Sequence, residues 1–196
     1  LFGVLIEGAG NMFSLAAALV RIQVAHGMIN SKEDFDLYDR IIIPGVGHAG
    51  TAMQKLRDTG LVDTILGLQK PVLGICVGMQ LMTSFSEEGE VPLLDIFPLK
   101  TLHFDKRIAE KVPHMGWNSV KIENNCPLFS EISDNVYFYF VHSYFIERDT
   151  QSVGASCTYG LSFAAAIQQD NFFGVQFHPE KSGKQGEQLL LNFSRL

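Results

Sequence analysis

A cysteine set between glycines and a His-Pro-Glu triplet are the residues of this chain best suited to chemistry. Cys76 lies in Gly74-Ile75-Cys76-Val77-Gly78, and His178 is separated from Glu180 by one proline. A thiol becomes a strong nucleophile when a base takes its proton, and an imidazole base needs a carboxylate that holds its orientation. In an extended segment, residues i and i+2 project to the same side. Cys76, His178 and Glu180 therefore predict a nucleophile, its base and an orienting carboxylate.

The glycines beside Cys76 predict a sharp turn between a strand and a helix. A nucleophile on such a turn needs small neighbours, as in the G-x-S-x-G elbow of serine hydrolases. A cysteine within apolar sequence is more often a small buried hydrophobe than a nucleophile. The catalytic interpretation depends on the conjunction of this turn with the His-x-Glu triplet and with a further glycine-rich turn, Pro44-Gly45-Val46-Gly47.

Short apolar segments that alternate with helical patterns predict the scaffold that positions these groups. The expected strands of this kind are 2–6, 40–43, 72–75 and 173–177. The expected helices are 14–23, 50–58, 60–68, a helix from the elbow to about residue 84, and 185–196. This alternation is typical of a layered α/β domain, whose parallel strands are buried on both faces. Further strands without long helical periodicity predict antiparallel or mixed additions to the sheet, at 99–104, 118–122, 136–141 and 163–167.

The glycine-bearing turns are expected to gather at one edge of this sheet. Each of the turns 8–10, 44–47 and 74–78 follows an apolar run, and ligands of open α/β sheets bind at the carboxyl ends of the strands. A dinucleotide fingerprint G-x-G-x-x-G would need glycine at position 13, where the chain has Phe13. A nucleotide site at the first turn is therefore not expected.

Composition excludes several classes of protein. The 196 residues are 46% hydrophobic and 18% charged, which favours one packed domain, 1–196. The net charge of −6 and the lack of a Lys/Arg cluster argue against nucleic acid, and no apolar run is long enough for a membrane span. Three widely spaced cysteines without a C-x-x-C pair favour a reducing, cytoplasmic compartment, and the histidines lack metal-ligand spacing. A strand is expected to begin at once at Leu1, so we expect a residue or two to precede it.

Several motifs together resemble the class I (triad) glutamine amidotransferases. The general ones are Pro44-Gly45-Val46-Gly47, the elbow 74–80 and Phe177-His178-Pro179-Glu180. The segments 113–118 (Pro-His-Met-Gly-Trp-Asn), 139–144 (Tyr-Phe-Val-His-Ser-Tyr) and 178–182 are similar, within this family, to the glutaminase subunits of imidazole glycerol phosphate synthases of histidine biosynthesis. The resemblance implies a layered, flavodoxin-like α/β domain.

The resemblance also implies a reaction and its residues. Cys76 would attack the side-chain amide of glutamine, and His178, oriented by Glu180, would move the protons. The oxyanion hole would consist of the backbone N–H groups of Val46 and Val77. The family places around the glutamine the positions that here are Gly47, Gln80, Glu88, His142, Ser143 and Tyr144. No cofactor and no metal is implied.

The resemblance implies a protein partner as well. Such glutaminases deliver ammonia to a (β/α)8-barrel cyclase, in a heterodimer that forms imidazole glycerol phosphate and aminoimidazole carboxamide ribotide. The matching docking positions are Asn11, Met115, Trp117 and Lys181. No phosphate loop is present for the cyclase substrate, so the synthase half is expected on another chain.

Alternative functions stay open at this point. The segments 6–11 and 92–98 differ from the usual pattern of these subunits, and related glutaminases feed other synthases, including sugar-modifying ones. A catalytically inactive docking protein of the same fold is the alternative outside enzymes. A cysteine peptidase or a redox protein is disfavoured because the amidotransferase motifs extend beyond the triad.

Overall fold

The computed structural model describes residues 1–5, 12–45, 47–105 and 107–196, with only the backbone at Met12. Its helices are α1 (Met12–Arg21), α2 (Ala49–Asp58), α3 (Val62–Leu66), α4 (Val77–Gln80) and α5 (Gly183–Phe193), and the 3-10 turns η1 (Glu33–Leu37), η2 (Pro127–Phe129) and η3 (Pro179–Lys181). Its strands are β1 (Phe2–Leu5), β2 (His26–Ile29), β3 (Arg40–Gly45), β4 (Val72–Cys76), β5 (Thr83–Ser86), β6 (Val91–Pro92), β7 (Phe97–His103), β8 (His114–Ile122), β9 (Val136–His142), β10 (Tyr144–Ile146), β11 (Val153–Tyr159), β12 (Leu161–Gln169) and β13 (Phe172–Val175).

The strands form a mixed sheet that confirms the predicted α/β class. Along its main path the order is β2-β1-β3-β4-β13-β12-β10-β7-β5-β6, and β11, β8 and β9 branch from β12. Strands β2, β1, β3, β4 and β13 pair in parallel, whereas β12 pairs antiparallel with β13 and β11. The parallel part carries the three strands whose glycine-bearing turns were expected at one edge, although residues 8–10 lie outside the described part of the chain.

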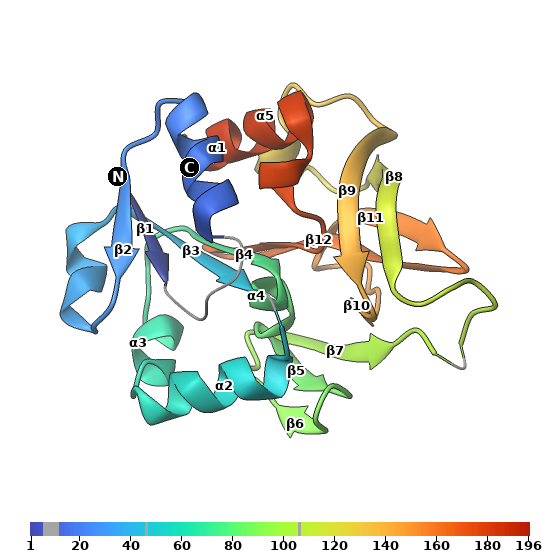
Figure 1. Cartoon of the computed structure of the whole chain (residues 1–196), viewed down its shortest axis with the longest axis horizontal. Helices are drawn as coiled ribbons and strands as arrows, with labels where there is room; N and C mark the ends of the chain where they lie inside the picture. The colour runs from blue at the N-terminus through green and yellow to red at the C-terminus, as the bar shows by residue number, and fades with distance from the viewer. Residues whose placement is uncertain (6–11, 46, 106) are drawn as a thin grey trace.

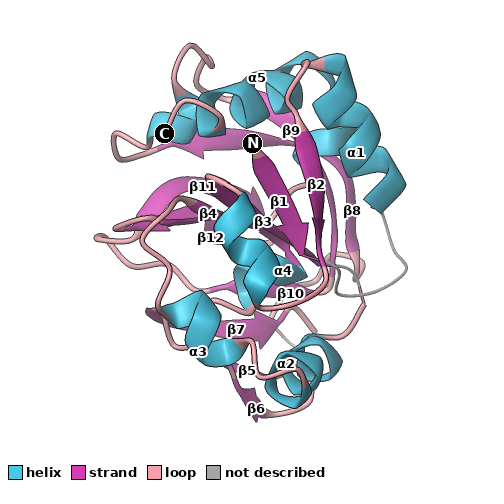
Figure 2. Cartoon of the chain, turned by 90° about the vertical axis from the view of Figure 1, so that its left-hand side faces the viewer, coloured by secondary structure: helices cyan, strands magenta, loops and turns pink. Residues whose placement is uncertain are grey.

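Helices cover both faces of the parallel strands, which explains why those strands read as continuous apolar runs. Helices α1 and α5 lie on one side and α2 and α3 on the other (Figures 1 and 2). Every residue of β4 is buried, and the ring of Phe2 on β1 meets that of Phe193 on α5 edge to face at 5.3 Å. A strand buried on both faces has no polar side to present.

The helix expected from the elbow to residue 84 was wrong beyond its first turn. Helix α4 ends at Gln80, and residues 83–86 form strand β5. The Thr83 hydroxyl donates to the Gln80 carbonyl at 2.8 Å, and β5 then pairs in parallel with β7. Thr and Phe favour strands. The pairing of residues 83–86 with β7 therefore outweighs the local tendency of helix α4 to continue.

Other differences concern short or weakly patterned strands. The strands β2, β6, β10 and β11 had no predicted counterpart, and the helix expected at 60–68 is only the five-residue α3. Strand β11 (VGASCTY) contains Gly154 and Ala155, and both of these residue types are depleted in strands. It pairs with β12 across a turn at Gly160, whose φ of +69° suits glycine.

Candidate active site

Cys76 sits at the sharp turn that its glycine neighbours predict. Strand β4 ends at Cys76, whose φ of +54° and ψ of −110° are strained for a non-glycine residue, and helix α4 begins at the next residue. A side chain at Gly78 would clash with the carbonyl oxygen of Ile43 on the neighbouring strand. Gly45, the last residue of β3, is in register with Cys76, so the end of β3 lies beside the turn at Cys76. The sequence thus places small residues where the backbone is most crowded.

His178 and Glu180 form a buried pair, but in a different backbone from the expected one. Nδ1 of His178 donates to Oε1 of Glu180 at 2.9 Å, with side-chain exposures of 3% and 2%. Glu180 lies in the 3-10 turn η3 rather than in an extended segment, since the amide of Lys181 donates back to the His178 carbonyl at 3.0 Å. The pair therefore depends on the turn that Pro179 begins, and not on strand alternation.

The charge state of His178 follows from competing effects. Burial alone lowers the pKa of an imidazole, but hydrogen bonds to Cys76 and to Glu180 outweigh it and raise the pKa of His178 above its usual value of 6.5. Since Glu180 holds Nδ1–H, the other ring nitrogen is the one available to exchange a proton with the thiol. The arrangement supports proton transfer between Cys76 and His178.

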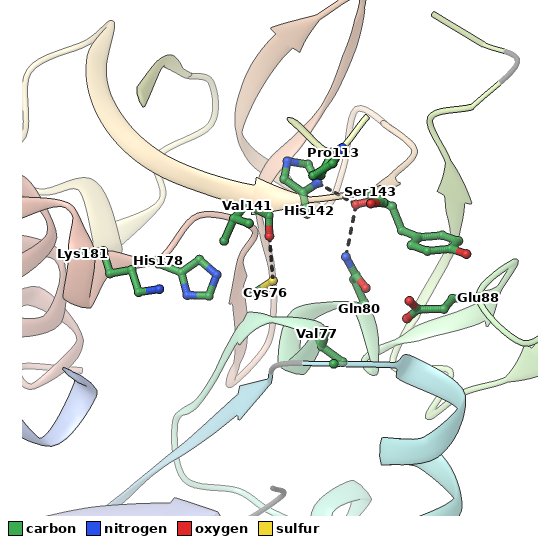
Figure 3. Close-up of a pocket in the computed structure, with 12 residues that line it drawn as sticks. Cys76, Val77, Gln80, Glu88, Pro113, Val141, His142, Ser143, His178 and Lys181 are labelled. Atoms are coloured by element: carbon green, nitrogen blue, oxygen red, sulfur yellow. Dashed lines mark hydrogen bonds between the residues drawn. The ribbon is translucent and has the colours of Figure 1, made fainter. Parts of the chain in front are cut away.

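A cavity of about 390 Å³ opens beside this triad. Figure 3 shows its layout, with His178 and Lys181 on one side of Cys76 and with Gln80 and Glu88 on the other. The cavity is lined by Gly47, Cys76, Val77, Gln80, Glu88, Pro113, Val141, His142, Ser143, Tyr144, His178 and Lys181. The Cys76 thiol thus lies between the side with His178 and Lys181 and the side with the Glu88 carboxylate.

The polar groups of the cavity are held by the protein. Oε2 of Glu88 accepts the amide N–H of Ala49, at the start of α2, at 2.6 Å. Nε2 of Gln80 donates to the Tyr144 carbonyl at 3.2 Å and to Oε1 of Gln176 at 3.0 Å, which leaves the Gln80 oxygen to face a ligand. Both side chains are thus positioned before a ligand arrives.

His142 and His114 form a buried pair of neutral rings. Nδ1 of His142 donates to the Tyr144 carbonyl at 2.7 Å, so its Nε2 accepts from Nδ1 of His114 at 2.9 Å. Burial lowers the pKa of His142 to about 3 and that of His114 to about 4. Both ring nitrogens of His142 are therefore used inside the protein, so only its ring surface and backbone border the cavity.

The structure brings most of the predicted site residues together. All six expected glutamine-binding residues line the cavity, as do Val77 and Lys181. Met115 and Trp117 are exposed on β8 instead, and Val46 and Asn11 lie outside the described residues. Sequence reasoning did not assign a role to Pro113, which lines the cavity, or to Val141 and Gln176, which contact the thiol.

Two negative findings concern residues 1–5, 12–45, 47–105 and 107–196. No group of three or more His, Cys, Asp or Glu side chains there could hold a metal ion. None of the helices in these ranges is long and apolar enough to cross a membrane.

The fold and the site define a class of enzyme that uses a cysteine nucleophile with a His–Glu pair on an α/β sheet. The chain matches the family described as "Glutamine amidotransferase class-I" over residues 8–195. It belongs to the class I glutamine amidotransferases.

Relatives and a solved structure agree with this membership. The chain is 48% identical to "Imidazole glycerol phosphate synthase subunit HisH" of Haemophilus influenzae, over 95% of this chain and 92% of that protein. It is 47% identical to the protein of the same name from Pasteurella multocida, over 93% and 91%. "PurLQS from Thermotoga maritima" shares the fold, with a TM-score of 0.77, 16% identity and coverage of 99% and 97%.

Selective labelling of Cys76 is the first expected result. Burial raises the pKa of Cys126 and of Cys157 to about 12, so both stay as unreactive thiols at neutral pH. A glutamine-mimicking diazo-ketone should therefore modify Cys76 at least about 100-fold faster than either. Mass spectrometry of the three cysteine peptides measures the rates, and equal labelling of Cys126 or Cys157 would contradict the assignment.

Proposed function

We propose that this chain is the glutaminase subunit of an imidazole glycerol phosphate synthase, which hydrolyses glutamine to glutamate and delivers ammonia to a cyclase subunit. The observation that carries the proposal is the Cys76–His178–Glu180 set at one end of a cavity that has Glu88 at its other end. The cavity volume of about 390 Å³ is ample for one amino acid. The high identity to proteins named as this subunit supports the same pathway.

Glutamine fits the cavity in one direction. Its side-chain amide must meet Cys76, so its charged end points towards Gln80 and Glu88. The Glu88 carboxylate would hold the α-ammonium, and Oε1 of Gln80 can accept a further N–H from the substrate. Gly47 and the backbone of Ser143 and Tyr144 complete the walls around this end.

Catalysis proceeds through a thioester. Cys76 gives its proton to His178, and the thiolate adds to the amide carbon of glutamine. The resulting oxyanion is held by the amide N–H of Val77, at the start of α4. The C–N bond then breaks as His178 returns the proton to the nitrogen, which leaves as ammonia. Water, deprotonated by His178, hydrolyses the thioester and releases glutamate.

The outer face of β8 and β9 is the proposed docking surface for a (β/α)8-barrel cyclase. Met115 and Trp117 are 62% and 55% exposed, and Tyr137 is 59% exposed on the neighbouring strand. Trp117 pairs across the sheet with Tyr139, and the Lys181 ammonium lies 5.9 Å from the centre of the Tyr139 ring. Lys181 also lines the cavity, so this aromatic surface reaches the mouth of the site, where ammonia must pass to a partner.

Trp117→Ala tests this surface. Exposed aromatic residues are frequent anchors of interfaces, so we expect the affinity for the cyclase to fall by about 30-fold. Glutamine binding should not change, since Trp117 does not line the cavity. Titration calorimetry with the cyclase subunit measures the affinity. Leu37→Ala is the matched control, because Leu37 on η1 is 64% exposed. Equal affinities of the two variants would show that Trp117 is not part of the interface.

The function itself is tested by reconstitution. We expect the chain, mixed with the cyclase subunit of imidazole glycerol phosphate synthase and its nucleotide substrate, to release one glutamate for each imidazole glycerol phosphate formed. Glutamate release without cyclised product would indicate a glutaminase that serves another synthase. Binding to the cyclase without glutamate release would indicate an inactive docking protein.

A further inference from the structure

Gln176 is a buried amide that contacts the nucleophile yet takes no part in the proton transfers. Its Nε2 lies 3.6 Å from Sγ of Cys76, and the residue is 0% exposed. Gln176 follows strand β13, two residues before His178, while Phe177 between them stacks on Phe138 in the core with ring centres 4.0 Å apart. The alternation of an extended chain thus directs both Gln176 and His178 at one sulfur atom.

The neighbours of Gln176 determine which way its amide points. The Tyr144 carbonyl can only accept, so the Gln80 atom 3.2 Å from it is the Nε2–H donor. The same nitrogen lies 3.0 Å from Gln176, whose facing atom must therefore be the acceptor Oε1. The remaining amide atom of Gln176, Nε2, is the one that faces the sulfur. An N–H donor is consequently aimed at the nucleophile.

A donor at this place acts differently on the two protonation states of Cys76. The neutral S–H group has an acceptor in the Val141 carbonyl, 4.0 Å away. A thiolate loses that interaction and faces the negative end of the carbonyl dipole, whereas an N–H group stabilises it. We infer that Gln176 is a further catalytic residue, whose amide donates a hydrogen bond to the Cys76 thiolate and so increases the fraction of charged nucleophile. The inference rests on the proposed glutaminase function of this site.

Other groups that titrate near the sulfur are kept unchanged in the test. His142, Tyr144, Glu88, Lys181 and His178 border the same cavity, and Glu180 lies behind His178. If the pH midpoint of Cys76 alkylation shifts when only Gln176 is changed, the shift is therefore assigned to the Gln176 amide.

Gln176→Glu is the sharpest variant, because it keeps the oxygen that Gln80 needs and replaces only the donor. The rate of Cys76 alkylation by iodoacetamide is measured across pH by mass spectrometry of the Cys76 peptide, so glutamine turnover is not required. We expect the midpoint of the pH profile to rise by roughly two units, because a carboxylate would repel the thiolate. Gln176→Met, which has no donor, should raise it by about one unit, equal to roughly tenfold slower alkylation below the midpoint.

Asn192→Leu serves as the matched control for loss of a buried amide. Asn192 is 2% exposed and donates to the carbonyls of Leu128 and Ser130 at 2.9 Å and 2.6 Å, away from the cavity. Its loss should lower stability without moving the alkylation midpoint. An unchanged midpoint in both Gln176 variants would overturn the inference. If wild-type Cys76 is alkylated no faster than Cys126, the proposed function fails instead.

Discussion

Replacing Cys76 with alanine is expected to abolish glutamine-dependent synthesis while the cyclase continues to use added ammonia. Alanine cannot form the thioester, and loss of the nucleophile of a comparable triad lowers kcat by about 10⁶-fold. His178→Ala should lower kcat nearly as much, since His178 is the base that hydrogen-bonds to Cys76 among the residues that the structure describes. Ammonia added to the solution bypasses both residues.

The measurement compares product formation from glutamine with product formation from ammonium chloride, with the cyclase present in both assays. Cys126→Ala is the matched control, because Cys126 is a buried thiol outside the cavity, and its activity should stay within about twofold of wild type. Equal loss of the glutamine-dependent and ammonia-dependent reactions in Cys76→Ala would mean that Cys76 supports the complex rather than glutamine hydrolysis.

Glu180→Gln is expected to lower kcat by about 10³-fold, less than removal of His178. The variant keeps the shape of the buried pair but removes the charge that stabilises protonated His178. An amide can also turn its NH₂ group towards Nδ1, which would leave the proton on the ring nitrogen that should act as the base.

The pH dependence of this variant is a second readout. The Glu180 carboxylate is one of the causes that raise the pKa of His178, so its loss should lower that pKa and shift the corresponding limb of the kcat/KM profile to lower pH. Glu187→Gln is the isosteric control, because Glu187 on α5 is paired with Arg21 at 2.7 Å and does not line the cavity. If Glu180→Gln lost as much activity as His178→Ala, Glu180 would have a role beyond orientation.

The turn at Cys76 and the pairing of His178 with Glu180 were predictable because each depends on residues that are close in sequence. The glycines around Cys76 reflect local crowding at a strand-to-helix turn, and only one residue separates His178 from Glu180. The alternation of apolar runs and helices predicted the α/β class for the same reason, since burial of parallel strands on both faces leaves a local pattern.

Tertiary contacts decided what local patterns could not. Residues 83–86 form strand β5 instead of the expected helix because they pair with β7. Strand β7 lies farther along the chain, so the local sequence does not indicate this pairing. Glu88 lies in a polar segment that is typical of a surface turn, and its carboxylate is held in the cavity by the amide of Ala49 at the start of α2.

The position of Gln176 beside the sulfur depends in the same way on distant segments. Its amide is turned by Gln80, 96 residues earlier in the chain, and by the Tyr144 carbonyl. Side-chain alternation in the extended segment after β13 is enough to predict that Gln176 and His178 point to the same side. No sequence pattern, however, indicates which amide atom of Gln176 faces the thiol. That direction is determined by hydrogen bonds between segments far apart in the sequence, and it therefore exists only in the folded protein.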